Sequence, residues 1–110
     1  MERIFGKSIE THKKQGKLTH KQKIIVLEYF GILTLLKSCP QEQQKANIIS
    51  AITREDFDNV KKALAFNTRF VEKGSRETKT KKNLEVVRDF FKENGLPEIA
   101  KKIQVDIDKI

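Results

Sequence analysis

The sequence predicts an all-α protein, a compact bundle of four to five short helices around a central apolar helix at about 20–37. Two observations predict this class. Apolar residues recur at helical spacing in several stretches, and helix start and stop signals separate those stretches. With 110 residues the chain has the size of one domain. We therefore expect a basic N-terminal arm or short helix over 1–18 and a single helical domain over 19–110.

The central helix is predicted from the apolar run IIVLEYFGILTLL at 24–36, whose 13 residues are too few to cross a bilayer. Thr19 and Gln22 match a capping box, so the helix should begin at about residue 20. Its apolar residues lie nearly all round the helix, which implies neighbours on more than one side. Gly31 weakens the helix by about 1 kcal/mol relative to alanine, and we expect a close helix crossing to compensate. Pro40 marks the end of this segment.

Two further helices are expected, one at about 41–51 and one from a capping segment at 53–56 to near Asn67. In the second of them three apolar side chains fall on one face, those of Phe57, Val60 and Leu64. A shared apolar face of this kind indicates that both helices pack against the central one.

The segment at about 42–66 resembles a helix-turn-helix, a hairpin of two helices that reads DNA in many proteins. In this interpretation Ala46 is the small residue of the first helix, Ser50 and Ala51 form the corner, and Ile52 is the apolar plug of the turn. The corner has no glycine, however, and three carboxylates would face the phosphates of DNA, those of Glu55, Asp56 and Asp58. We therefore predict a helical hairpin and keep a DNA reader as the alternative.

Two last helices are expected on either side of Gly95, a residue that readily adopts the left-handed conformation at a helix end. Pro97 suits the first turn of the final helix, in which isoleucine recurs every four residues. The stretch 103–108 also alternates apolar and polar residues, as a strand would. The start signal at Pro97 favours a helix, and the strand stays open as the alternative.

The most unusual feature of the composition is a net charge of +8, from 23 basic and 15 acidic residues. Residues 1–23 carry +5 and residues 67–82 carry +4, whereas 24–66 are neutral and 83–110 carry −1. The whole excess therefore lies in two short polar segments. Clustered basic residues are typical of phosphate binding, although they also serve solubility.

The candidate contacts with nucleic acid lie in these two basic segments. The first could follow a phosphate backbone, and the second includes one aromatic side chain that could stack on a base. The alternative is that Phe70 and Val71 pin the second segment to the core while its charges are only solvated. The candidate nucleic-acid-binding residues are Lys13, Lys14, Lys17, Lys21, Lys23, Arg69, Phe70, Lys73, Arg76, Lys79, Lys81 and Lys82.

Residues that would carry catalysis are sparse in this sequence. His12 and His20 have no further ligands at metal-binding spacing, so we expect no metal site. Cys39 is alone, cannot form an internal disulfide and is predicted to be a semi-buried structural thiol, which fits a reducing cytoplasm. We expect a cytoplasmic, non-enzymatic protein without a cofactor, a small-molecule ligand or a membrane partner.

Three stretches from Leu18 onward resemble a known kind of domain in their general sequence pattern. They are LTHKQKIIVLEYFGIL, FDNVKKAL and KTKKNLEVVRDFFKENGLPEIAKKIQVDI. They resemble a small helical domain of uncharacterised proteins from bacterial mobile elements. The resemblance covers most of the chain and includes no catalytic motif. It implies a recurring fold and a regulatory or accessory role, and it assigns no site residue.

Two functions follow from these observations. The first is a small basic binding domain that contacts the phosphates of DNA or RNA. The second is a helical protein interaction module or homo-oligomer, which the large share of apolar side chains on the central helix favours. Convergence of the two basic segments on one face of the folded chain would favour the first.

Overall fold

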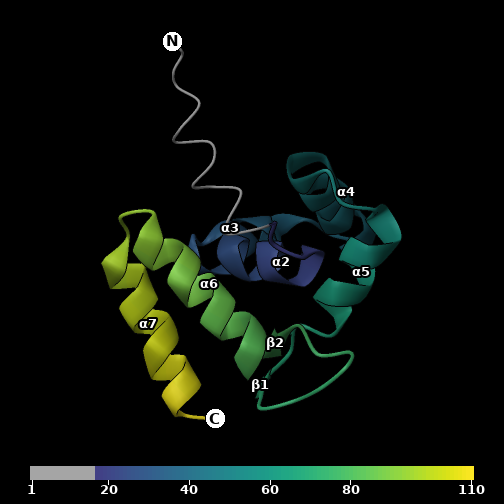
Figure 1. The fold of residues 1–110 in the computed structure, drawn as a ribbon. Coiled ribbons are helices and arrows are strands. Elements are labelled where there is room, and N and C mark those ends of the chain that lie inside the picture. The colour runs from purple at the N-terminus through teal and green to yellow at the C-terminus, as the bar shows by residue number, and fades with distance from the viewer. Residues whose placement is uncertain (1–16) are drawn as a thin grey trace.

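The computed structural model describes residues 17–110, and it confirms the all-α class. Most of the predicted N-terminal arm, with Lys13 and Lys14, lies outside the described residues. The helices are α2 (His20–Tyr29), α3 (Ile32–Leu35), the 3₁₀ helix η1 (Leu36–Ser38), α4 (Glu42–Thr53), α5 (Phe57–Ala65), α6 (Lys81–Glu93) and α7 (Pro97–Asp108). In Figure 1 the pairs α4–α5 and α6–α7 lie on opposite sides of α2, which is therefore the central helix.

The predicted single helix at 20–37 is wrong in one respect, because it is broken after Tyr29. Gly31 adopts a left-handed φ of +85°, which ends α2 and redirects the chain into α3. A Cβ added to Gly31 would meet nothing within 4 Å, so no helix crosses there. The glycine is needed for its backbone conformation and not for a close approach.

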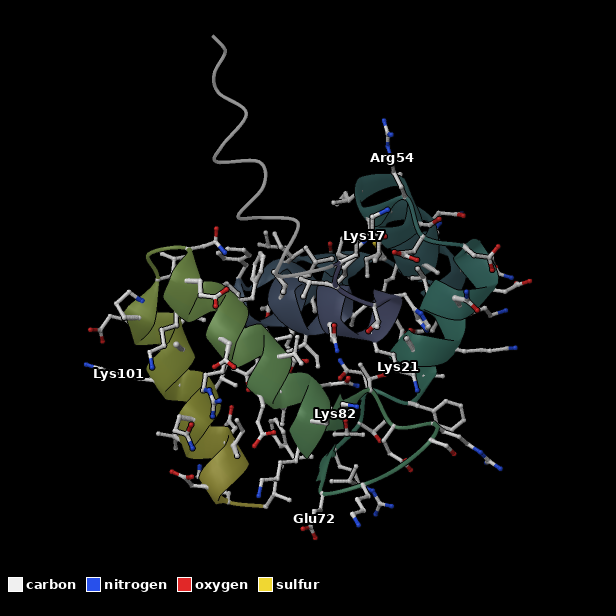
Figure 2. The ribbon with its side chains drawn as sticks, in the orientation of Figure 1. Lys17, Lys21, Arg54, Glu72, Lys82 and Lys101 are labelled. Atoms are coloured by element: carbon white, nitrogen blue, oxygen red, sulfur yellow. The ribbon has the colours of Figure 1, made fainter. Side chains whose placement is uncertain are left out.

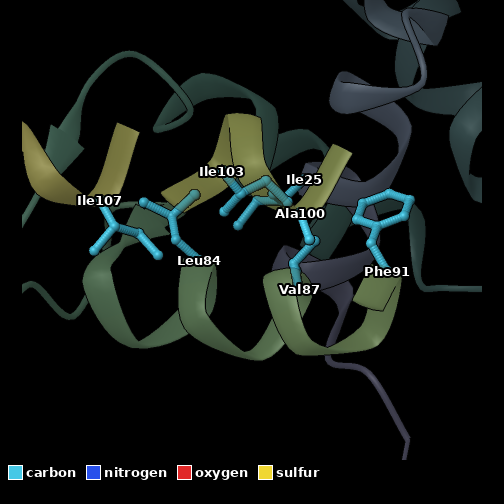
Figure 3. Packing of buried hydrophobic residues seen from close by; sticks show 7 residues of the cluster. All are labelled: Ile25, Leu84, Val87, Phe91, Ala100, Ile103 and Ile107. Carbon is cyan, nitrogen blue, oxygen red and sulfur yellow. The ribbon is translucent and has the colours of Figure 1, made fainter. Parts of the chain in front are cut away.

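Adjacent residues of α2 face two separate core clusters. Ile25 packs with residues of α6 and α7, including Val87, Phe91 and Ile103, as Figure 3 shows. Ile24 packs with residues of α4 and α5, including Ala46, Ile49, Val60 and Ala63. The prediction that α2 has neighbours on more than one side is therefore confirmed.

The turn between α4 and α5 differs from the helix-turn-helix prediction. Ser50, Ala51 and Ile52 lie within α4, so they form no corner, and Ile52 is 58% exposed, so it plugs no turn. The corner is formed by 54–56 instead, where Arg54 has a left-handed φ of +61° and supplies the bend without a glycine. The helical hairpin is present, and its identity as a DNA reader stays a prediction.

The ends of the later helices follow their sequence signals. Asp56, and not Thr53, caps α5 by accepting from the N–H of Asn59 at 3.2 Å. Gly95 has a φ of +82° between α6 and α7, as predicted. The final segment is a helix that starts at Pro97, so the strand alternative is wrong. Its isoleucines at 103 and 107 fall on one helical face and reach the core.

Residues 66–80 form a loop closed by a short parallel pair that the sequence did not predict. Strand β1 (Phe70–Val71) pairs with β2 (Lys79–Thr80) in the register Phe70 to Lys79 and Val71 to Thr80. The two strands draw the ends of the second basic segment together, and the residues between them form the open loop at the edge of Figure 1. We call residues 72–78 the basic loop because they lie within the basic segment 67–82, although Lys73 and Arg76 are balanced by Glu72 and Glu77 within the loop itself.

Candidate functional site

The two basic segments meet in the folded chain. The Nζ of Lys21, in the first turn of α2, donates a hydrogen bond to the carbonyl oxygen of Ser75 in the basic loop at 2.9 Å. These residues are 54 positions apart in the sequence. In Figure 2, Lys21 and Lys82 lie on the side of the molecule that carries the basic loop, whereas Lys101 lies on the far side of α7. Within the described residues, the start of α2 and the basic loop therefore lie on one face, whereas Lys17 lies on the other side of α2 in the same view.

Thr78 fixes the basic loop against α5. Its side chain is fully buried, its hydroxyl donates to the carbonyl of Ala63, and its N–H donates to the carbonyl of Phe66 at 3.2 Å. A buried threonine between two chain segments is held in one place because both of its polar groups need partners. The return arm of the loop is thus tied to the C-terminal end of α5.

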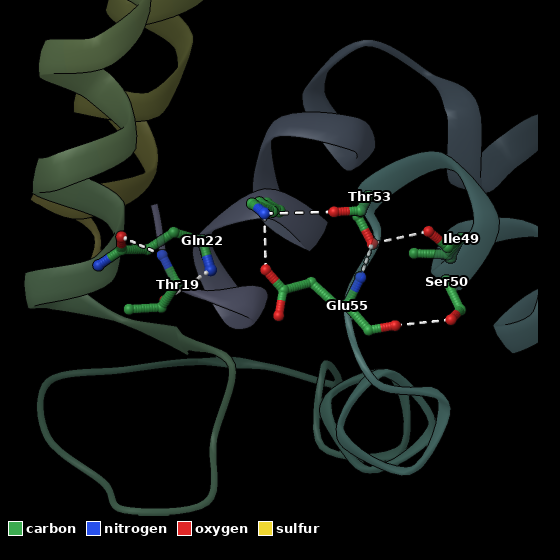
Figure 4. A network of polar contacts seen from close by, with 7 residues as sticks. Thr19, Gln22, Ile49, Ser50, Thr53 and Glu55 are labelled. Atoms are coloured by element: carbon green, nitrogen blue, oxygen red, sulfur yellow. Dashed lines mark hydrogen bonds and ion pairs between the residues drawn. The ribbon is translucent and has the colours of Figure 1, made fainter. Parts of the chain in front are cut away.

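The first turns of α2 and α6 are joined by a chain of hydrogen bonds. Thr19 and Gln22 form the predicted capping box, in which each side chain bonds to the other residue's backbone N–H, as Figure 4 shows. The side-chain Nε2 of Gln22 donates to the Oδ1 of Asn83 in α6 at 3.1 Å. The Nδ2 of Asn83 in turn donates to the carbonyl oxygen of Thr78 at 3.0 Å. Two helix N-termini, each with the positive end of its dipole, are thereby held beside the basic loop.

A pocket of about 290 Å³ opens where α2, α5 and the basic loop meet. Cationic and histidine side chains from all three elements line it, namely His20, Lys21, Lys62 and Arg76. Its apolar wall includes Ala63 and Phe66, and none of the described residues that line it is acidic. The pocket combines positive charge with an apolar wall, so it can accept an anionic group attached to a flat apolar one. We call it the basic pocket.

Some candidate residues are engaged inside the protein instead. The side chain of Lys79 is only 9% exposed, bonds to the carboxylate of Glu28 at 3.2 Å and lies 4.5 Å from the centre of the Phe70 ring. Lys23 bonds to Glu55 at 2.6 Å and to the carbonyl of Thr53 at 3.3 Å. These contacts stabilise the fold, so Lys79 and Lys23 are poorly placed to contact a partner, whereas the Phe70 ring is still 38% exposed.

The other predicted residues among 17–110 are open to solvent. Arg76 lines the basic pocket. Lys73 lies in the basic loop, Lys81 and Lys82 lie in the first turn of α6, and Arg69 directly precedes β1. Lys17 lies on the other side of α2 from Lys21 in Figure 2. Lys21 is half-buried at the pocket. Of the candidate cations among residues 17–110, Lys21 and Arg76 line the pocket itself.

Sequence reasoning missed three residues of this site, His20, Lys62 and Phe66. Lys62 lies in a segment that is neutral as a whole, so the charge distribution did not single it out. The available signal was the pair Lys61–Lys62 on the polar face of α5, opposite its apolar residues. Only the packing of α5 against α2 brings Lys62 to the pocket.

Other reactive groups in the described part of the chain form no comparable site. Across residues 17–110, no group of three His, Cys, Asp or Glu side chains is arranged to hold a metal ion. No helix there is long and apolar enough to cross a membrane. Burial and the neighbouring Asp106 carboxylate raise the pKa of Tyr29, whose hydroxyl donates to that carboxylate, and Cys39 is a half-buried free thiol. The basic face is thus the strongest candidate site.

Comparisons with protein-family models, with curated proteins and with solved structures find no match for this chain.

Proposed function

We propose that this chain is a small basic non-enzymatic domain that binds nucleic-acid phosphates through the face formed by α2, α5 and the basic loop. The observation that carries the proposal is the hydrogen bond between Lys21 and Ser75, which joins the two basic segments. In a cytoplasmic setting, such a domain would serve a regulatory or accessory role. No bond is made or broken in this function, which consists of binding alone.

Phosphate binding is favoured because several cationic side chains of the pocket keep free donors or unneutralised charge in the described part of the chain. A lysine amino group has three donors, and Lys21 uses one of them on Ser75, so two remain for a phosphate. Lys62 and Arg76 have no ion-pair partner among residues 17–110, so their charge is not neutralised there. Each phosphate that these cations neutralise would release condensed counterions, which is the main driving force for such binding.

The supporting residues extend the same face. Lys73 in the basic loop and Lys81 and Lys82 at the start of α6 are exposed and would contact neighbouring phosphates, as would Arg69 and Lys17 farther along the nucleic acid. We propose Lys13 and Lys14 as further contacts on the N-terminal side. Recognition through backbone phosphates does not require α5 to read bases.

The test is fluorescence anisotropy with a labelled DNA duplex and a labelled RNA, titrated with protein at several salt concentrations. The affinity should fall steeply with salt, by about 0.9 logarithmic units per phosphate contact for each logarithmic unit of salt on duplex DNA. The triple variant Lys21→Gln, Lys62→Gln, Arg76→Gln should lower this slope by about 2 to 3.

A matched control keeps the net charge of the triple variant but alters another face. Lys92→Gln, Lys101→Gln, Lys102→Gln removes the same three charges from exposed positions of α6 and α7. This control should bind with a slope close to that of the unaltered protein. The proposal fails if the protein binds neither nucleic acid at low salt. It also fails if both triple variants lower the salt-dependence slope of the affinity by the same amount.

A protein interaction module is the second candidate function. On α4, Ile48 and Ile52 are one helical turn apart and are 39% and 58% exposed, which leaves an apolar strip at the surface. Such a strip is typical of a contact with another protein or with a second copy of the chain. Light scattering over a hundredfold range of concentration tests self-association, and a constant monomer mass would exclude the homo-oligomer.

A further inference from the structure

We propose that the basic pocket holds one unstacked base of a single-stranded nucleic acid, while the cations at its rim hold the adjoining phosphates. This inference rests on the proposed function and adds the form of nucleic acid that the face prefers. It is carried by the joint presence of an aromatic wall and a cationic rim in one pocket. Phosphate binding alone would need only the rim.

The wall of the pocket suits a flat, apolar ring. Phe66, which is 38% exposed, lines the pocket together with Ala63, so part of an aromatic ring and a small side chain face the same space. At about 290 Å³ the pocket is at the small end of ligand pockets, which is the scale of a single base. Bases stack readily on aromatic side chains, and this contact tolerates any sequence because every base has a π face.

The rim of the pocket suits the phosphates on either side of that base. Lys21, Lys62 and Arg76 line the pocket from three different elements, so they do not line up along one helix. Each can meet a phosphate oxygen while the base points inward. Asn59, on the same wall, adds an amide that can donate to and accept from the edge of a base.

The pocket is already shaped before any ligand binds. Thr78 holds the loop to α5 through Ala63, and Lys21 holds the loop to α2 through Ser75. A preformed pocket loses less conformational freedom on binding than a mobile loop would. A base inside a duplex is stacked and paired, so it cannot enter without being extruded. The pocket therefore favours single strands over duplexes.

The experiment compares three labelled probes at one salt concentration: an oligothymidylate, a strand of the same length with abasic sugars, and a duplex of that length. The abasic strand keeps the phosphates and lacks the bases, so the ratio of the two single-strand affinities isolates the base contact. The unaltered protein should bind oligothymidylate roughly tenfold more tightly than the abasic strand. It should also bind the oligothymidylate more tightly than the duplex.

Three variants locate the base contact. Phe66→Leu keeps an apolar side chain for packing and removes the ring, so the tenfold ratio should fall towards one. Phe30→Ala removes a phenyl group that is 52% exposed and lies on no wall of this pocket, so it should keep the ratio. Phe70→Ala tests the other aromatic side chain near the basic loop, and it too should keep the ratio. Circular dichroism and thermal unfolding verify that each variant is folded.

Several outcomes would overturn the inference. A ratio near one in the unaltered protein would show that bases add nothing, and an unchanged ratio in folded Phe66→Leu would place the base elsewhere. Loss of the ratio in Phe70→Ala but not in Phe66→Leu would assign the base to Phe70. In each case salt-dependent binding of the abasic strand would leave the proposed function intact. If no probe binds at low salt, the proposed function itself fails.

Discussion

Lys21 and Ser75 are 54 positions apart in the sequence, yet the amino group of Lys21 lies 2.9 Å from the carbonyl oxygen of Ser75. This contact joins the start of α2 to the basic loop. Because residues 1–23 carry +5 and residues 67–82 carry +4, this contact joins the two segments that hold the excess charge into one basic face. The stability of that face should depend on the residues that hold the loop.

The first prediction concerns Thr78. Thr78→Val keeps the shape of the buried side chain but leaves the carbonyl of Ala63 without its hydroxyl donor. An unsatisfied buried acceptor costs about 1 to 3 kcal/mol, and the free energy of unfolding should fall by that amount in urea denaturation. Thr34→Val, at an exposed position of α3, is the matched control and should change stability by less than about 0.5 kcal/mol. Equal effects of the two substitutions would contradict the role of Thr78.

The second prediction concerns Gly31. Gly31→Ala should lower the free energy of unfolding by about 1 to 2 kcal/mol, because φ at this position is +85°. No neighbour would clash with the added Cβ, so the cost is purely conformational. Gly31→Asn should be tolerated better, since asparagine enters the left-handed region more easily. Thermal unfolding of both variants checks this order, and an alanine variant as stable as the original protein would refute it.

The third prediction concerns the pair of Lys79 and Glu28. Lys79→Met removes one partner of a largely buried ion pair and should destabilise the protein by about 1 to 3 kcal/mol. In the double variant with Glu28→Gln part of this loss should be recovered, because no unpaired carboxylate then remains. The salt dependence of nucleic-acid binding should stay unchanged in folded Lys79→Met. A lowered slope would show that Lys79 contacts phosphate after all.

The fourth prediction concerns Tyr29. Burial, followed by the hydrogen bond and the charge of Asp106, raises its pKa above the ordinary value of 10.0, so the folded state favours the neutral phenol. The unfolded chain loses this proton near pH 10 and the folded chain does not. The free energy of unfolding should therefore be undiminished below pH 10 and fall above it, by about 1.4 kcal/mol per pH unit from this group.

Tyr29 is the protein's sole tyrosine, so its ionisation can be observed directly by ultraviolet absorbance. Tyrosinate should appear only together with alkaline unfolding. Tyr29→Phe should lack this part of the pH dependence, while the titration of lysines continues in both proteins. A tyrosinate signal near pH 10 in the folded protein would contradict the buried hydrogen bond to Asp106.

The helices were predictable because their signals are local. Thr19 and Gln22 form the capping box that their spacing indicated, and Gly95 and Pro97 separate the last two helices as expected. Gly31 differs from its prediction because its left-handed conformation ends the helix, whereas the apolar run on both sides of it indicates one continuous helix. Each of these outcomes depends on a few neighbouring residues.

The features that the sequence did not predict depend on contacts between distant segments or on strained backbone. Arg54 adopts a left-handed conformation that residue type alone disfavours, so the corner was placed too early, at Ser50. Charge per segment identified residues 67–82, but it could not show that Lys62 of α5 lies beside them. Lys79 was expected at the surface because lysine usually is, and its pairing with Glu28 becomes visible only in the folded chain.

The most direct test of the basic face is amide chemical-shift mapping of the labelled protein during titration with oligothymidylate. We expect the largest shifts to appear together in the first turn of α2, along α5 near Lys62 and in the basic loop, and to weaken as salt is added. Residues of α7 near Lys101 should remain unshifted. Shifts centred on α7 or on the exposed strip of Ile48 and Ile52, or no shifts at low salt, would contradict a nucleic-acid-binding role for this face.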